Sequence, residues 1–230
     1  MADAVPERPM RESVVESSES LTERAYRELE EQIVTLRLAP GAVVTEASLA
    51  LRLGIGRTPI REALQRLARE RLVVILPRRG VVIAEENLTT QLRLIELRRE
   101  VERLLARAAA RRATPEQRRR FGEIAAGMEE AGGANDDIGF MRLDRAFNLL
   151  MLDAARNEFA AGAMSLMHGL SRRFWYIHYR AVADLPLAAR LHADVARAVA
   201  AGEGEAAQQA SDRLLDYIEA FARATAAADA

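Results

Sequence analysis

The stretch GIGRTPIREALQRL, residues 54–67, constrains the fold more than any other part of the sequence. A proline in a helix interior costs about 3 kcal/mol, yet at the start of a helix its missing N–H is no loss. Pro59 therefore predicts a helix start, with Thr58 as the capping residue. Gly54 and Gly56 allow a sharp turn just before it, so this helix points away from the helix that precedes it.

Further helical and strand patterns surround this stretch. Periodic apolar residues and β-branched runs predict helices at about 20–36, 45–53 and 58–71 and strands at 72–76 and 81–83. Thr45 is a suitable N-cap for the second helix, and the basic turn at 77–80 connects the two strands. Three helices, a glycine turn between the second and third, and a hairpin form a winged helix-turn-helix arrangement.

The same region is basic within a slightly acidic chain. Residues 45–83 hold eight arginines and three glutamates, whereas the whole chain has a formal net charge of −1. Such a concentration is typical of a region that meets a phosphate backbone, although a solvated charged face would give the same count. Arg57 and Arg61 stand at the end by which recognition helices enter the major groove, where an arginine pairs with guanine for roughly 1–3 kcal/mol. The turn glycines and the hairpin tip, with Arg78 and Arg79, favour DNA binding.

Beyond residue 88 the apolar pattern is helical almost throughout. We expect helices at about 89–113, 115–131, 136–155, 158–180, 186–201 and 204–226. The predicted fold class is therefore mainly α, with an N-terminal winged helix-turn-helix followed by an all-α antiparallel bundle of about six helices. The predicted organisation is a flexible tail at 1–17, a DNA-binding domain at 18–84, a linker at 85–88 and the helical domain at 89–226.

The sequence lacks the features of several other protein classes. It contains no cysteine, which excludes disulfides, thiolate zinc sites and cysteine nucleophiles. No apolar run approaches the roughly 18 residues that span a bilayer, and the acidic N-terminus is no secretory signal, so we expect a cytoplasmic protein. There is no phosphate loop, nucleophile elbow or HExxH motif, and His168, His178 and His192 share no helix face. We therefore expect no enzyme activity. Two alternative classes remain, namely an enzyme and a winged-helix protein that binds other proteins and no DNA.

Residues 44–73, VTEASLALRLGIGRTPIREALQRLARERLV, resemble the DNA-binding domain of the GntR family of bacterial transcription regulators. The resemblance is to the FadR-like branch, in which an all-α effector domain of the FCD type follows. Residues 94–114, LIELRREVERLLARAAARRAT, look like the first helix of that domain. The resemblance implies a ligand-responsive regulator, more often a repressor, that binds a palindromic double-stranded DNA operator as a homodimer. It also implies that residues 89–226 bind the effector and form the dimer.

The resemblance further implies which residues meet DNA. In some members, an arginine just after the position of Glu46 makes a contact, whereas this sequence has Ala47 there. We therefore expect the operator preference to differ. The DNA-binding candidates are Glu46, Arg57, Thr58, Arg61, Arg78, Arg79 and Gly80.

Many effector domains of this type resemble one another in a metal site made of an Asp, a His four residues later and two further histidines about 22 residues apart. Residues at i and i+4 share a helix face and converge on one ion. Here Asp144 and His192 fit, whereas Asn148 and Leu214 stand where histidines are expected. We therefore assign no cofactor and expect a pocket that binds a small molecule without a metal ion. The alternative is a weakly bound divalent ion on Asp144, Asn148 and His192, in a metal-dependent sensor or an enzyme-like domain.

The segment LSRRFWYIHYR, residues 170–180, combines aromatic rings, arginines and the only tryptophan. Aromatic stripes at helical spacing are more often core or dimer contacts, but rings beside guanidinium groups suit an organic carboxylate or phosphate. Arg98 is a further candidate, since the matching family arginine often faces the cavity. The effector-binding candidates are Arg98, Asp144, Asn148, Arg173, Trp175, His178 and His192, and the expected effector is an organic acid or a related anion.

Overall fold

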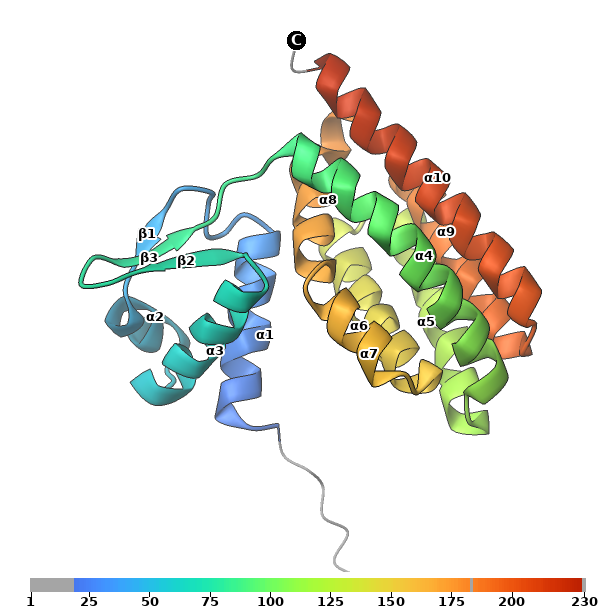
Figure 1. Ribbon diagram of the computed structural model, residues 1–230, viewed down its shortest axis with the longest axis horizontal. Coiled ribbons are helices and arrows are strands. Elements are labelled where there is room, and N and C mark those ends of the chain that lie inside the picture. Colours follow the sequence, from blue (N-terminus) through green and yellow to red (C-terminus); the bar gives the residue numbers. More distant parts are fainter. Residues whose placement is uncertain (1–18, 183, 229–230) are drawn as a thin grey trace, which may run out of the picture.

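The computed structural model describes residues 19–182 and 184–228, so the tail expected at 1–17 lies outside the described residues. An N-terminal part with three helices and a small sheet stands beside a larger bundle of helices (Figure 1). Each part is built around its own hydrophobic core. The fold class predicted from the sequence is confirmed.

The N-terminal part is a winged helix domain. It contains the helices α1 (Leu21–Val34), α2 (Glu46–Leu53) and α3 (Arg57–Arg69) and the strands β1 (Val43–Val44), β2 (Val73–Leu76) and β3 (Gly80–Ile83). The sheet order is β1-β3-β2 with antiparallel pairing, so that Val43 and Val74 lie on either side of Val82. β1 was not predicted, because two residues are too few to show a strand period.

The start of α3 differs from the sequence prediction. Its N-cap is Gly56 and its first residue is Arg57. The prediction that Thr58 caps the helix is therefore wrong by two positions. Pro59 still falls in the first turn, where backbone N–H groups have no partner inside the helix, so its missing N–H costs no hydrogen bond. Thr45 does cap α2 as predicted, because its Oγ1 accepts a hydrogen bond from the Ser48 N–H at 3.0 Å.

The hairpin of β2 and β3 forms the wing and extends away from the bundle (Figure 1). Gly80, at the start of β3, has a φ of 104°, and a Cβ at this position would lie 2.7 Å from the carbonyl oxygen of Val44. Only glycine fits this backbone conformation and this close approach of β1. The turn before Gly80 places Arg78 and Arg79 in solvent.

The C-terminal part contains seven helices within the described residues. They are α4 (Leu88–Arg112), α5 (Pro115–Gly133), α6 (Asp137–Ala155), α7 (Glu158–Ser165), α8 (His168–Val182), α9 (Leu185–Ala201) and α10 (Gly204–Ala228). The helix predicted at 158–180 is thus two helices. No glycine or proline stands at 166–167 to reveal the break. After it, α8 lies against the winged domain, where a Cβ on Gly169 would be 2.7 Å from Cδ1 of Leu72. This tertiary contact, which no local pattern shows, fixes the direction of α8.

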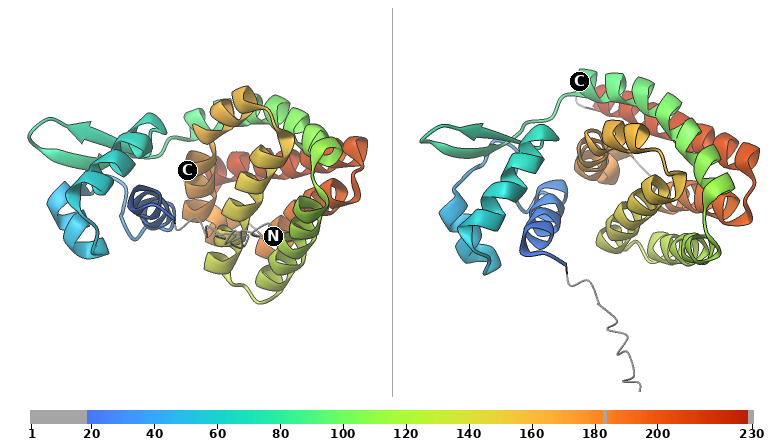
Figure 2. Two further views of the ribbon diagram at one scale, coloured as in Figure 1. Left: turned by 90° about the horizontal axis from the view of Figure 1, so that it is seen from below. Right: turned by 60° about the horizontal axis from the view of Figure 1, so that its bottom comes forward.

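Helix α1 lies between the rest of the winged domain and the bundle in each view (Figures 1 and 2). Val34, the last residue of α1, belongs to the core of the bundle, and Leu170 of α8 packs against the core of the winged domain. The two parts therefore share a packed interface, with α1 and α8 in contact.

Candidate functional site

The first turn of α3 presents the predicted DNA-contacting side chains. Arg57, Thr58 and Arg61 are all exposed. Glu46, the first residue of α2, accepts two hydrogen bonds from Nε and Nη2 of Arg61 at 2.9 and 2.8 Å. The Arg61 guanidinium accordingly lowers the pKa of Glu46. A bidentate carboxylate holds a guanidinium in one plane, so Glu46 orients Arg61 on this surface.

The wing adds positive charge. Arg78 and Arg79 are exposed at its tip, next to Gly80. Like Arg57, they make no ion pair with any described residue, so their guanidinium groups are available to phosphate oxygens. The recognition helix and the wing thus expose arginines at the positions singled out from the sequence, and their contact with DNA stays a prediction.

A small cavity lies inside the bundle. Its volume is about 40 Å³, which accommodates a few water molecules or the head group of a small molecule. Five predicted effector-binding residues line it, namely Arg98, Asp144, Asn148, Trp175 and His192. Sequence reasoning missed the polar residues Gln91, His168, Ser171 and Arg172 and the aromatic residues Phe140, Phe174, Tyr217 and Phe221, which also line it. We call this cavity the bundle pocket.

The other two effector candidates lie outside the bundle pocket. Arg173 donates a hydrogen bond from Nη2 to the carbonyl oxygen of Ala84 and lines a different cavity. The ring of His178 lies 4.7 Å, centroid to centroid, from that of Phe174, and His178 does not line the pocket. Neighbouring residues of a helix differ in direction by about 100°, so Arg172 and Arg173 face different surroundings. The sequence shows this pair of arginines but not which one points inward.

The carboxylate of Asp144 is contacted by Asn148, Arg172 and His192. Its Oδ1 accepts a hydrogen bond from Nδ2 of Asn148 at 3.1 Å and lies 3.4 Å from Nε2 of His192. Its Oδ2 forms an ion pair with Nε of Arg172 at 2.9 Å. Leu214 lines a neighbouring cavity, and no group of three or more His, Asp or Glu side chains in the described part of the chain could hold a metal. The residues therefore do not fit the metal site of the resemblance, because a guanidinium supplies the positive charge beside Asp144.

Arg172 joins the bundle pocket to the winged domain. Its side chain is only 8% exposed. Besides Asp144, it binds Glu30 of α1 through Nη1, and its Nη2 donates to the carbonyl oxygen of Met141 at 2.6 Å. Burial lowers the pKa of Arg172, but Glu30 and Asp144 outweigh it and leave the pKa raised. Asp144, Arg172 and Glu30 thus form a buried chain of charges between the bundle pocket and α1, and removing any one of them would leave an uncompensated buried charge.

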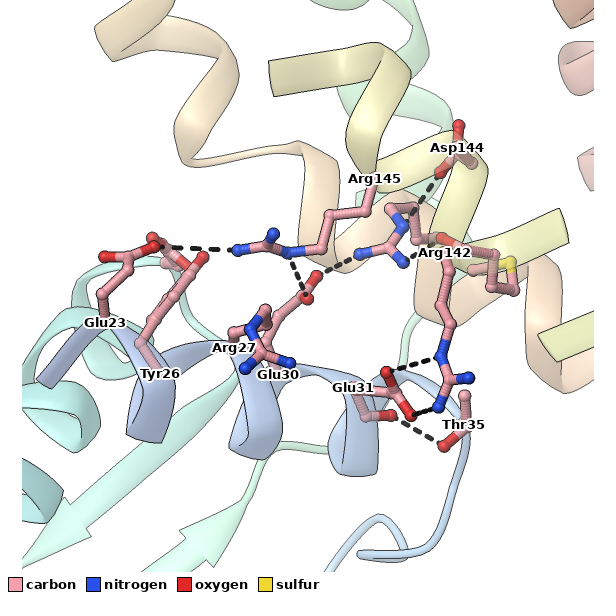
Figure 3. Close-up of polar contacts among 12 residues, drawn as sticks. Glu23, Tyr26, Arg27, Glu30, Glu31, Thr35, Arg142, Asp144 and Arg145 are labelled. Carbon is pink, nitrogen blue, oxygen red and sulfur yellow. Dashed lines mark hydrogen bonds and ion pairs between the residues drawn. The ribbon is translucent and has the colours of Figure 1, made fainter. Parts of the chain in front are cut away.

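Further ion pairs surround this link (Figure 3). Arg145 of α6 pairs with Glu30 at 3.2 Å, and Arg142 of the same helix pairs with Glu31 at 2.8 Å. The Arg142 side chain is 63% exposed, and exposed pairs contribute only about 0–1 kcal/mol. The interface of α1 thus contains a buried ionic link to the bundle pocket, at Glu30, and more exposed ion pairs at Glu23 and Glu31.

The bundle pocket combines two guanidinium groups and several neutral polar groups with the carboxylate of Asp144. Burial, together with the nearby Arg98, lowers the pKa of His168 to about 3, so this imidazole is neutral at ordinary pH. Arg98 is buried and donates from Nε to Glu102 at 2.6 Å. Guanidinium, amide and hydroxyl groups surrounded by aromatic rings suit a small organic anion.

A winged helix whose recognition helix and wing carry exposed arginines, joined to a helical bundle, defines a DNA-binding transcription regulator. Comparison with known families agrees with this class. Residues 21–83 match the family described as bacterial regulatory proteins, gntR family, and residues 93–217 match the FCD domain. The chain therefore belongs to the GntR family of bacterial transcription regulators, in the group that carries an FCD domain.

The relatives are themselves transcription regulators. The HTH-type transcriptional repressor RspR of Escherichia coli is 24% identical over 212 residues, which cover 92% of this chain and 93% of that protein. The regulator McbR of Escherichia coli is 27% identical over 130 residues, or 56% of this chain and 59% of that protein. A solved structure of McbR has a TM-score of 0.76 at 21% identity, covering 90% of this chain and 98% of that chain, and so shares the fold. None of the described helices is long and apolar enough to cross a membrane.

Proposed function

We propose that this DNA-binding regulator is a repressor whose operator affinity is controlled by a small organic acid or a related anion in the bundle pocket. The similarity to RspR, a transcriptional repressor, supports repression. The two guanidinium groups of Arg98 and Arg172 in the pocket lining support an anionic ligand. The resemblance to the family supports a homodimer that binds a palindromic operator in the cytoplasm.

The proposal of ligand control rests on the buried ion pairs that connect Asp144 through Arg172 to Glu30. An anionic ligand in the bundle pocket repels Asp144 and attracts Arg172. The guanidinium then shifts relative to Glu30, which changes how α1 lies against the bundle. Because α1 is part of the winged domain, α3 moves with it and operator affinity changes. The ligand acts through the difference in its affinity for the two arrangements.

A ligand screen followed by one conservative substitution tests this mechanism. Thermal-shift measurements with a panel of small organic acids identify the ligand, because binding to the native state raises its stability. Fluorescence anisotropy with the protein's own upstream DNA then measures operator affinity. We expect the ligand to weaken wild-type binding by about fivefold or more. Glu30→Gln should reduce that ratio to below about twofold, because glutamine keeps the shape of Glu30 but not the charge that holds Arg172.

Glu31→Gln is the matched control, since it makes the same change one residue along α1 at the exposed pair with Arg142. This variant should keep the wild-type response to the ligand. An equal loss of response in both variants would point to general loosening of the interface and away from Arg172. Ligand control would be ruled out if no organic acid both stabilised the protein and altered operator affinity.

A further inference from the structure

A second cavity, with a volume of about 180 Å³, lies where the winged domain meets the bundle. Its lining includes Arg71 from the turn before β2, Glu85 and Glu86 from the connection between β3 and α4, and Arg173 from α8. Gln91 is the residue that lines both this cavity and the bundle pocket. We call the second space the junction cavity. It is larger than the bundle pocket and is bounded by both parts of the molecule.

Arg173 is a buried cation whose charge has no carboxylate partner. The residue is 1% exposed, and its Nη2 donates to the carbonyl oxygen of Ala84. Its Nε is buried without a hydrogen-bond partner among the described residues. Burial lowers the pKa of Arg173, as expected for a guanidinium that has lost water and gained no direct ion pair. A buried charge of this kind requires a compensating group, and the cavity that Arg173 lines has room for one.

Glu86, which lines the same cavity, is a partly buried acid without an ion-pair partner in the described part of the chain. Its Oε2 is buried and has no hydrogen-bond partner among the described residues. Burial raises the pKa of Glu86 to about 7, although the positive charge of Arg173 acts in the opposite direction. The two side chains therefore attract each other across the cavity but form no ion pair. One unpaired N–H donor and one unpaired carboxylate oxygen thus belong to two residues that line the same space.

We propose that the junction cavity binds a small zwitterion of the α-amino acid class, with its carboxylate on Arg173 and its ammonium group on Glu86. A simple anion would compensate Arg173 but would also face Glu85 and Glu86. A simple cation would compensate Glu86 but would also face Arg71 and Arg173. A molecule with both charged groups on one carbon satisfies both ends, and each resulting contact is a charge-assisted hydrogen bond. This site goes beyond the proposed function, because it is separate from the bundle pocket.

Occupation of the junction cavity would hold the two parts of the protein together. The lining comes from the winged domain, from the connection and from α8, so the ligand would contact elements on both sides of the interface. Such a ligand binds one arrangement of the two parts better than others, and its binding raises the stability of that arrangement.

Thermal-shift measurements on the full chain with each standard L-amino acid at about 10 mM test this site. At least one amino acid should raise the melting temperature by several degrees. Its two half-molecules, the carboxylic acid without the amino group and the amine without the carboxylate, should each give less than about a third of that shift, because each leaves one buried charge unpaired. Calorimetric titration then gives the affinity of the amino acid identified.

Glu86→Gln and Arg173→Gln should each weaken that affinity by about tenfold or more. Glu86→Gln preserves shape and keeps the test decisive if Arg173→Gln fails to fold. Glu31→Gln, the same change at a residue of α1 outside the cavity lining, should leave the affinity within about twofold of the wild type. The zwitterion site would be overturned if no amino acid shifted the melting temperature by more than about one degree, if the half-molecules did as well, or if Glu86→Gln had no effect. These outcomes are independent of ligand control through the bundle pocket, because that test does not involve Glu86 or Arg173.

Discussion

We propose that DNA recognition depends most directly on Arg61, because Glu46 holds its guanidinium in a fixed plane at the exposed end of α3. Arg61→Ala should weaken operator binding by about 10- to 100-fold, since an arginine that reads a base contributes roughly 1–3 kcal/mol. Loss of one phosphate contact would instead reduce the slope of log affinity against log salt by about 1. Fluorescence anisotropy titrations at several salt concentrations distinguish a base contact of Arg61 from a phosphate contact. Arg69→Ala, an exposed arginine in the last turn of the same helix, is the control, and equal losses in both variants would contradict this role for Arg61.

For single residues, the sequence shows which side chains are present in a helix but not which way each of them points. Arg98, Asp144 and His192 could be assigned to the pocket because the resemblance supplies their positions. Arg172 could not, because it is next to Arg173 and nothing local distinguishes a side chain that reaches Asp144 from one that reaches Ala84. The rotation of α8 about its axis decides this, and packing against the winged domain sets that rotation.

The wing is the element whose geometry depends most on one residue. Gly80→Ala should destabilise the winged domain by about 1–2 kcal/mol, because a non-glycine residue at positive φ is strained and the new Cβ would meet Val44. Gly122→Ala in α5 is the matched control, since a Cβ there meets nothing within 4 Å. That change should stabilise the protein by about 0.5–1 kcal/mol, because alanine is the better helix former. Urea unfolding measures both, and the same sign for the two variants would contradict this account of the wing.

Elements are predictable from sequence where local chemistry marks their ends. A capping box of Thr114 and Gln117 starts α5 at the predicted position, and Gly202 ends α9. The break between α7 and α8 carries no such mark and depends on a contact with Leu72, about a hundred residues earlier in the chain. Periodicity reports which face of a helix is buried, and it continues unchanged across such a break.

For the whole molecule, the sequence predicts two parts but not how they dock. The apolar faces of α1 are explained by the core of the winged domain alone, so nothing in the pattern shows that Val34 enters the bundle core. Nothing in the sequence pattern of α1 shows that Glu30 is buried against Arg172 and Arg145. Such long-range ion pairs depend on the placement of one folded part against the other.

The same junction makes the stability of the whole molecule depend on pH. Burial raises the pKa of Glu86 to about 7 from an ordinary value of 4.5. Between these pH values the folded protein keeps a proton that the unfolded chain has released, so the free energy of unfolding falls as pH rises and levels off above about pH 7. Glu86→Gln removes this contribution. The free energy of unfolding of the variant, relative to that of the wild type, should therefore rise by about 1–2 kcal/mol from roughly pH 5 to pH 8. This is less than the full pKa shift implies, because Glu86 is only partly buried. Urea unfolding at both pH values measures this gain, with the exposed Glu85→Gln as control, and a gain independent of pH would show that Glu86 does not ionise in this range.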